Sequence, residues 1–263
     1  MNVAQNPTAA PGYFSVADAL DGRPGWHASD LSASASASAS AGGSQGPHLP
    51  PPGASNRARA GLTGCFGRLS TEQQAAKTFK ADVKQWKQAA PTSVEGWARW
   101  MAARSLNNAY RKKAADLDLH DLGLSTLPRC LKDMPNVKKL QVSHNGLDRL
   151  AALPPALQEL SAHCNFLTKI DALPKGLTRL LVDENFLQSL PPLPATLTEL
   201  HACNNVLEAL PAPLPPALKV LMAPGNDLTS LPALPEHLER INYDGNPLGT
   251  TPRLPPGCVQ VSF

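Results

Sequence analysis

Five side chains of types that bind transition metals occur in the middle of the chain: His163, Cys164, Asp183, His201 and Cys203. Imidazole, thiolate and carboxylate groups are the usual protein ligands of zinc and related ions. Residues about twenty positions apart would meet only if the fold repeats at that interval. On a stack of strands these side chains would lie in flat rows, which do not converge on a tetrahedral site. We therefore predict no metal site and no cofactor.

The sequence gives equally little support for nucleophilic catalysis. Ser143 and Ser161 have no base nearby at the spacing of a catalytic triad, so we interpret both as solvated strand residues. No nucleotide-binding loop, serine elbow or HExxH motif occurs. The five cysteines are odd in number and lack CxxC spacing, which argues against a disulfide framework and favours a reducing compartment. We predict that the chain as it stands is not an enzyme.

The elements that would position these side chains follow from a repeat of about twenty residues. An asparagine recurs in the frame LxxLxVxxNxLxxLPxLPxx, at Asn145, Asn165, Asn185, Asn205, Asn226 and Asn246. Counted from the first apolar position, the repeats begin at Ala114, Val137, Leu157, Leu177, Leu197, Leu218 and Leu238, and an eighth begins at Cys258. Self-similarity at this period is typical of leucine-rich repeats.

Each repeat position has a structural explanation. Alternation in the first part of a repeat predicts a short parallel strand, with side chains such as Leu200 and Ala202 pointing into a shared core. The recurring asparagine is expected to be buried and to bond backbone groups where the strand turns away, which is a structural role. The paired prolines of the LPxLP segments exclude a full helix, so the convex side should be extended. The prediction is an α/β leucine-rich-repeat solenoid.

Two helices should precede the repeats. Residues 70–90 begin with a capping box formed by Ser70 and Gln73, and a second helix begins at Thr92, where Glu95 repeats the cap pattern. We expect this pair to cover the apolar edge of the first repeat, with Trp86, Trp97 and Trp100 as lid residues, because an open solenoid needs a terminal cap. The alternative is that the tryptophans form a separate binding surface.

The composition divides the chain into three segments. Residues 1–69 form a Ser/Ala/Pro-rich leader predicted to be disordered, 70–113 form the helical cap, and 114–263 form the repeat domain. The start of the chain resembles no secretory signal, and no apolar stretch is long enough to span a membrane. The cap carries 9 Lys/Arg against 3 acidic residues, whereas the repeats carry 11 against 15. The basic cap is read as a solvated face, with contact to an acidic partner as the alternative.

Positions three, five and seven of each strand should point to the concave face, where binding would occur. The sixth repeat is apolar at all three, with Val220, Met222 and Pro224. Exposed apolar clusters rimmed by polar groups tend to be contact sites, so we predict that this patch anchors a partner protein. The neighbours expected to take part are Leu181, His201, Arg179, Glu199, Arg240 and Asn242. The alternative is ordinary apolar packing across neighbouring strands.

Four segments follow one another in the chain: ADVKQWKQAAP, a second helix, LDLHDLGLSTLP, and then repeats of the LPPALQELSAHCNFL type. This order resembles the type III secreted leucine-rich-repeat effectors of Gram-negative bacteria. The resemblance spans roughly residues 70–257. The family has two groups: the YopM-like effectors, and the IpaH-type effectors with an additional E3 ubiquitin ligase domain. It implies delivery into a host cell by the N-terminal leader and binding of a host protein along the repeats. A nucleic-acid partner is not expected.

The resemblance leaves two functions open. Ligases of this family use a Cys-x-Asp motif in a helical domain beyond the repeats, and none of the five cysteines of this chain has an aspartate two positions later. The first interpretation is therefore a non-catalytic effector. The alternative is the substrate-recognition part, or a truncated remnant, of such a ligase. A structural or adhesive protein of the cell surface would need a secretory signal.

Overall fold

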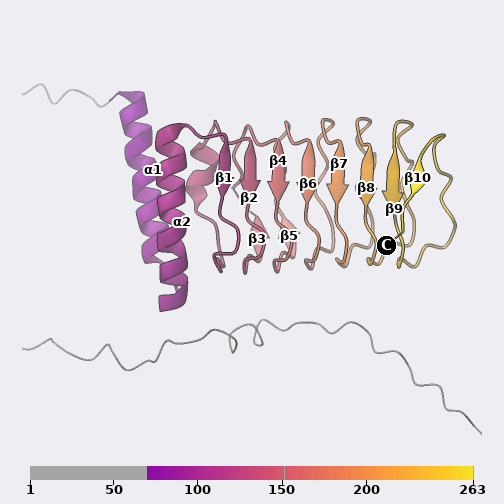
Figure 1. Cartoon of the computed structure of the whole chain (residues 1–263), viewed down its shortest axis with the longest axis horizontal. Helices are drawn as coiled ribbons and strands as arrows, with labels where there is room; N and C mark the ends of the chain where they lie inside the picture. The colour runs from indigo at the N-terminus through magenta and orange to yellow at the C-terminus, as the bar shows by residue number, and fades with distance from the viewer. Residues whose placement is uncertain (1–69, 151, 263) are drawn as a thin grey trace, which may run out of the picture. The chain divides into compact units, whose positions relative to one another are not determined.

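The structure is a computed structural model, which describes residues 70–150 and 152–262. The predicted leader, residues 1–69, lies outside the described residues. Two helices come first, and the chain then winds through parallel strands (Figure 1). Neither of the two α-helices in this described part is long and apolar enough to cross a membrane.

The two helices are α1 (Thr71–Gln88) and α2 (Ser93–Lys112). At α1 the predicted capping box is present, because Gln73 N donates to Ser70 Oγ at 3.2 Å and Ser70 N donates to Gln73 Oε1 at 3.0 Å. At α2 only half of the expected box forms: Glu95 N donates to Thr92 Oγ1 at 3.1 Å. The Glu95 carboxylate instead accepts hydrogen bonds from other groups, described below.

The strands form the predicted parallel solenoid. One sheet of eight strands contains β1 (Asp116–Asp118), β2 (Lys139–Gln141), β4 (Glu159–Ser161), β6 (Arg179–Leu181), β7 (Glu199–His201), β8 (Val220–Met222), β9 (Arg240–Asn242) and β10 (Val259–Gln260). All neighbours pair in parallel, and equivalent positions of successive repeats face each other, as Leu160 faces Leu180. The last pair is out of step by one residue, since Val259 pairs with Arg240.

The opposite side of the solenoid is mostly extended, as the prolines indicate. Two short strands there, β3 (Arg149–Leu150) and β5 (Lys169–Ile170), form a second parallel sheet. The first repeat differs from the extended expectation, because it contains the 3₁₀ helix η1 (Arg129–Asp133). This repeat is three residues longer than the typical one and lacks the LPxLP segment, so its backbone is free to form a helical turn.

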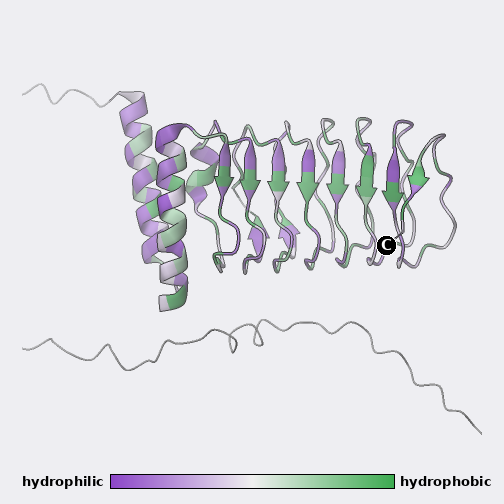
Figure 2. Cartoon of the chain, viewed as in Figure 1, coloured by the Kyte–Doolittle hydropathy of each residue, from purple (hydrophilic) through white to green (hydrophobic). Residues whose placement is uncertain are grey.

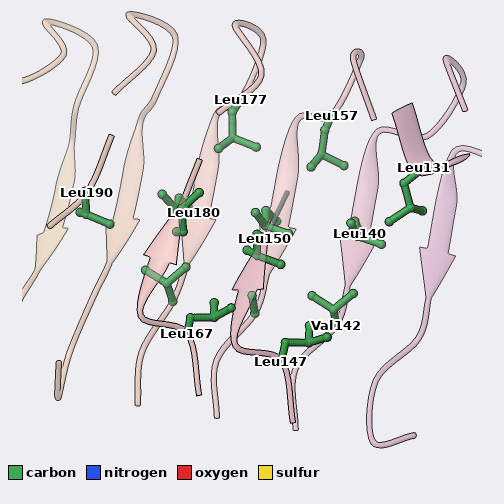
Figure 3. Close-up of a cluster of buried hydrophobic side chains, with 14 of the residues drawn as sticks. Leu131, Leu140, Val142, Leu147, Leu150, Leu157, Leu167, Leu177, Leu180 and Leu190 are labelled. Carbon is green, nitrogen blue, oxygen red and sulfur yellow. The ribbon is translucent and has the colours of Figure 1, made fainter. Parts of the chain in front are cut away.

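Leucines from both sides of the solenoid meet in one continuous core (Figure 3). Leu140, Leu160 and Leu180 are almost fully buried, and they come from successive strands. Each recurring asparagine lies beside this core: Asn185 Nδ2 donates to the carbonyls of Ala162, Val182 and Asp183 at 3.0–3.1 Å, and its Oδ1 accepts from Leu167 N at 3.0 Å. The asparagines thus bond the backbone of their own repeat to that of the repeat before.

A buried polar network joins the two helices to the first repeat. Arg99, which is 4 % exposed, donates to Glu95 Oε1 at 3.0 Å, to the Trp86 carbonyl at 2.7 Å and to Thr126 Oγ1 at 3.0 Å. The same Glu95 oxygen accepts hydrogen bonds from the amide of Ser125 at 3.0 Å and its hydroxyl at 2.7 Å. Glu95 is therefore used between elements rather than as the second half of a capping box.

The expectation for the tryptophans is correct for Trp86 and wrong for Trp97 and Trp100. Trp86 is half-buried and its Nε1 donates to Thr126 Oγ1 at 3.2 Å. Trp97 and Trp100 are 64 % and 44 % exposed. They do not lie on the buried side of α2, which consists mainly of small side chains around Leu106. Figure 2 shows that both hydrophilic and hydrophobic residues occur along α2. The small residues allow close packing of α2, so the large rings face outward.

Candidate functional site

The sheet of eight strands is drawn in Figure 1, and its face turned away from the core is here called the open face. It contains the first and third residue of each three-residue strand. The middle residue of each full strand points into the core, so its two neighbours lie on this face because side chains alternate along a strand. Equivalent residues of neighbouring strands lie side by side. The open face is therefore two parallel rows of side chains.

One of these rows is a chain of opposite charges. Glu159 Oε2 lies 3.3 Å from Lys139 Nζ and 3.6 Å from Arg179 Nη1. Arg179 Nε then donates to Glu199 Oε2 at 2.7 Å. Burial alone would raise the pKa of Glu199, but the hydrogen bond and the charge of Arg179 outweigh it and hold the pKa below its ordinary value. All four groups are partly exposed, so the row can exchange its internal pairs for charges of a partner.

A shallow hollow of about 100 Å³ lies beside this row, over β2, β4 and β6. Its lining includes Lys139, Gln141, Glu159, Ser161, Arg179 and Leu181. One strand further, His201 Nε2 lies 2.9 Å from Glu199 Oε1 without the orientation of a hydrogen bond, and this buried nitrogen has no hydrogen-bond partner among the described residues. Two predicted site residues, Arg179 and Leu181, thus meet at one hollow, with Glu199 and His201 next to it.

The predicted apolar anchor is wrong in its main premise, which was exposure. Val220 and Met222 are only 7 % and 4 % exposed, and Asn242, also assigned to the site, is 1 % exposed. Side chains of β7 and β9 lie on both sides of Val220 and Met222 at one strand spacing, so the apolar side chains of β8 form part of the packing of the sheet. Pro224 is half-buried and Arg240 is exposed. The interpretation as cross-strand packing, left open above, fits β8 better.

Two of the five metal-ligating side chains named from the sequence, His163 and Cys164, lie close to a third such side chain, His144, which was not among them. His144, His163 and Cys164 have ligand atoms within 4.8 Å of one another. Cys164 Sγ also lies 3.2 Å from Glu184 Oε2, with the thiol as donor. Burial and the carboxylate of Glu184 raise the pKa of the Cys164 thiol to about 12, so the thiol stays protonated at neutral pH. His201, Cys203 and Asp183 do not join this group.

Known structures resemble this fold, whereas comparison by sequence finds little. No family model matches the chain, and no curated protein matches it. YopM from Yersinia enterocolitica shares 35% sequence identity over 70% of this chain, with a TM-score of 0.65. A Shigella effector leucine-rich-repeat domain shares 32% identity over 67% of this chain and 77% of its own, with a TM-score of 0.61. The chain belongs to the YopM-like leucine-rich-repeat effectors.

YopM from Yersinia pestis, described as a leucine-rich effector protein, is 32% identical over 65% of this chain, with a TM-score of 0.54. The chain spans 40% of the length of the Y. enterocolitica protein and 54% of the Y. pestis one. The predicted family and the predicted repeat fold are therefore confirmed.

Sequence reasoning missed one exposed row of this repeat effector. Phe166, Phe186 and Val206 follow the recurring asparagines directly, and they are 45 %, 54 % and 37 % exposed. The two phenylalanine rings stack with centroids 6.2 Å apart. Large apolar side chains at the same position in three successive repeats were visible in the sequence, and this was the available signal. The row is a second surface on which an apolar partner could pack.

Proposed function

We propose that this chain is a type III secretion effector that binds a host protein through the open face of its repeat sheet, without catalysing a reaction itself. The observation that carries the proposal is the hollow beside the charge row, where Arg179 and Leu181 meet and where the groups remain partly exposed. Membership in the leucine-rich-repeat effectors supports the proposal, because the related proteins are effectors.

The chemistry of the hollow indicates what kind of partner fits. An apolar side chain would pack on Leu181, and flanking charges of the partner would replace the internal pairs of Arg179 and Glu199. We therefore expect an extended or loop segment of a folded host protein, with an apolar residue between charged ones.

The direct test is capture from host-cell lysate with purified wild-type protein and with Leu181→Asp and Arg179→Glu variants. Wild type should retain one host protein reproducibly, and each variant should lose at least roughly tenfold of its affinity once that protein is purified and titrated, equivalent to about 1.4 kcal/mol. Leu181→Asp should weaken binding because it places a charge in the apolar contact, and Arg179→Glu should weaken it because it reverses one charge of the charge row.

Lys169→Glu is the matched control, because Lys169 is an exposed basic residue on β5, away from the open face. It should bind like wild type. A Phe166→Ser/Phe186→Ser double variant tests the second surface in the same titration. The proposed site would be refuted if the open-face variants, folded by circular dichroism, bound the partner as tightly as wild type.

Delivery is tested separately with residues 1–69 fused to a translocation reporter. We expect the fusion to enter host cells from bacteria with a working type III apparatus and to remain inside bacteria that lack it. The secretion part of the proposal would be contradicted if the fusion entered host cells without the apparatus, or did not enter them at all. The binding part is tested independently by the titration.

A further inference from the structure

The turn at the end of each strand repeats the same backbone conformation. The residue before each recurring asparagine has a positive φ, as in His144 (54°), Cys164 (53°) and Glu184 (54°). The turns are stacked by backbone hydrogen bonds, with His144 N donating to His163 O and Cys164 N donating to Asp183 O, each at 3.0 Å. Three successive turns therefore place an imidazole, a thiol and a carboxylate next to one another at one edge of the sheet.

We propose that His144, His163 and Cys164 form a zinc-binding site, with the carboxylate of Glu184 as the fourth ligand. The ligand atoms of the first three residues lie within 4.8 Å of one another, and Glu184 Oε2 is 3.2 Å from Cys164 Sγ. Zinc binds nitrogen, oxygen and sulfur at about 2.0–2.3 Å in a tetrahedron, which sets neighbouring ligand atoms roughly 3.3–3.8 Å apart. The three ligand atoms must approach one another by about 1 Å, and Glu184, which lies outside the group of three, must turn further toward the imidazoles. The side chains of His144 and Glu184 are both exposed and free to rotate.

The neighbouring serines hold one ligand in place. His163 Nδ1 lies 2.9 Å from Ser143 Oγ and 3.1 Å from Ser161 Oγ, and Ser143 is only 3 % exposed. When Nδ1 carries the proton and donates it to a serine oxygen, Nε2 presents its lone pair to the metal. Metal-bound histidines in proteins usually have such a partner on the other ring nitrogen, and the partner fixes both tautomer and ring orientation.

The ligand set selects the type of ion. Two imidazoles, a thiolate and a carboxylate favour zinc over magnesium or calcium, which prefer oxygen ligands. Binding replaces the proton on Cys164 Sγ with a sulfur–zinc bond and releases one proton to the solvent. Within residues 70–150 and 152–262, this is the one group of three such side chains that comes together. None of the four proposed ligands lines the hollow assigned to the host protein, although Ser161 borders both sites.

Cobalt is the direct probe, because it reports its ligands through its absorption. The full chain, reduced and freed of metal, is titrated with Co²⁺ and then with Zn²⁺. We expect one ion per chain, a thiolate-to-cobalt charge-transfer band, the visible bands of four-coordinate cobalt, and displacement of cobalt by zinc. Zinc should also raise the melting temperature of the wild-type protein, because it binds the folded state.

Matched variants decide the outcome. Cys164→Ser should abolish the charge-transfer band, His144→Ala and His163→Ala should weaken zinc binding, and Ser143→Ala should weaken it roughly tenfold. Cys203→Ser is the control, because Cys203 lies two repeats after Cys164, is half-buried beside Asp183 and is outside the group. The proposal is overturned if the band survives Cys164→Ser, if Cys203→Ser removes it equally, or if cobalt binds without any thiolate band.

Discussion

The first and the later turns of the solenoid are stabilised in different ways. The first repeat packs against α2 and is joined to both helices by the network of Glu95 and Arg99. The last described full repeat has no such partner. Its Leu248 and Asn246 are half-buried, although the equivalent residues of the preceding repeats, such as Leu228 and Asn226, are buried. A consensus residue is therefore fully buried only where a neighbouring layer covers it on both sides.

The largest expected effect comes from breaking the buried ion pair at the first turn. Glu95→Ala leaves Arg99 charged and 4 % exposed without its partner, so we expect a loss of about 3–5 kcal/mol in the free energy of unfolding. Chemical denaturation followed by circular dichroism measures it. As control, Lys219→Ala breaks an exposed pair with Glu239 on the later turns and should leave the midpoint unchanged. Equal losses of unfolding free energy in both variants would contradict the conclusion that the first turn depends on a buried ion pair and the later turns do not.

Next in size is the truncation of a core leucine at two places along the solenoid. Leu207→Ala removes a fully buried side chain and should destabilise the protein by about 2–5 kcal/mol, because it leaves a cavity. Leu248→Ala changes the equivalent residue of the last described full repeat, which is half-buried, and should cost clearly less. Denaturation midpoints measured side by side decide whether position along the solenoid sets the cost.

The asparagine row allows the same comparison with polar groups. Asn185→Ala leaves buried carbonyls and one amide without partners, and we expect a loss of about 1–3 kcal/mol. Asn246 makes the same kind of bonds but is half-buried, so water can replace its side chain and the loss should be smaller. Hydrogen exchange at Leu167 N and Leu228 N, which donate to these two side chains, reports each change locally. Similar losses at the two positions would refute the role of exposure.

The smallest expected effect is a dependence of stability on pH at the first turn. Burial alone would raise the pKa of Glu95, but hydrogen bonds from Ser125 and Arg99 outweigh it and lower the pKa. The ionised Glu95 carboxylate therefore contributes its full stabilisation of the fold at pH values above the ordinary glutamate pKa of about 4.3. This contribution is lost as the pH falls below that value and through the lowered pKa of Glu95 in the folded state. Unfolding measured from neutral to acidic pH should show this loss in wild type and a weaker one in Glu95→Gln.

Much of the architecture was readable from the sequence because one rule repeats along the chain. The spacing of Asn145 to Asn246 predicted the parallel strands and their register, and the Ser70 and Thr92 patterns predicted where the helices begin. The partner site was predicted less well. Val220 and Met222 were assigned to the surface from their position in the repeat, and the packing of neighbouring strands buries them.

The remaining errors share a physical cause, which is that burial depends on what packs against a residue. Trp97 and Trp100 were expected in the lid from their hydrophobicity, but α2 packs through its small residues. Periodicity alone does not say which of two apolar sides of a helix will be covered. Phe166 and Phe186 recur at the same repeat position, directly after the asparagine, and this pattern was visible in the sequence. Their exposure was not, because it depends on the direction that the chain takes after the asparagine.

The repeat period, the parallel order of the strands and the inward position of the leucines were determined by the sequence, because a side chain that recurs every twenty residues has one way to stack. Tertiary structure alone decided which side chains meet between repeats. His144, His163 and Cys164 come together because stacked turns with positive φ turn their side chains to one edge, and that contact depends on rotation angles that no spacing encodes.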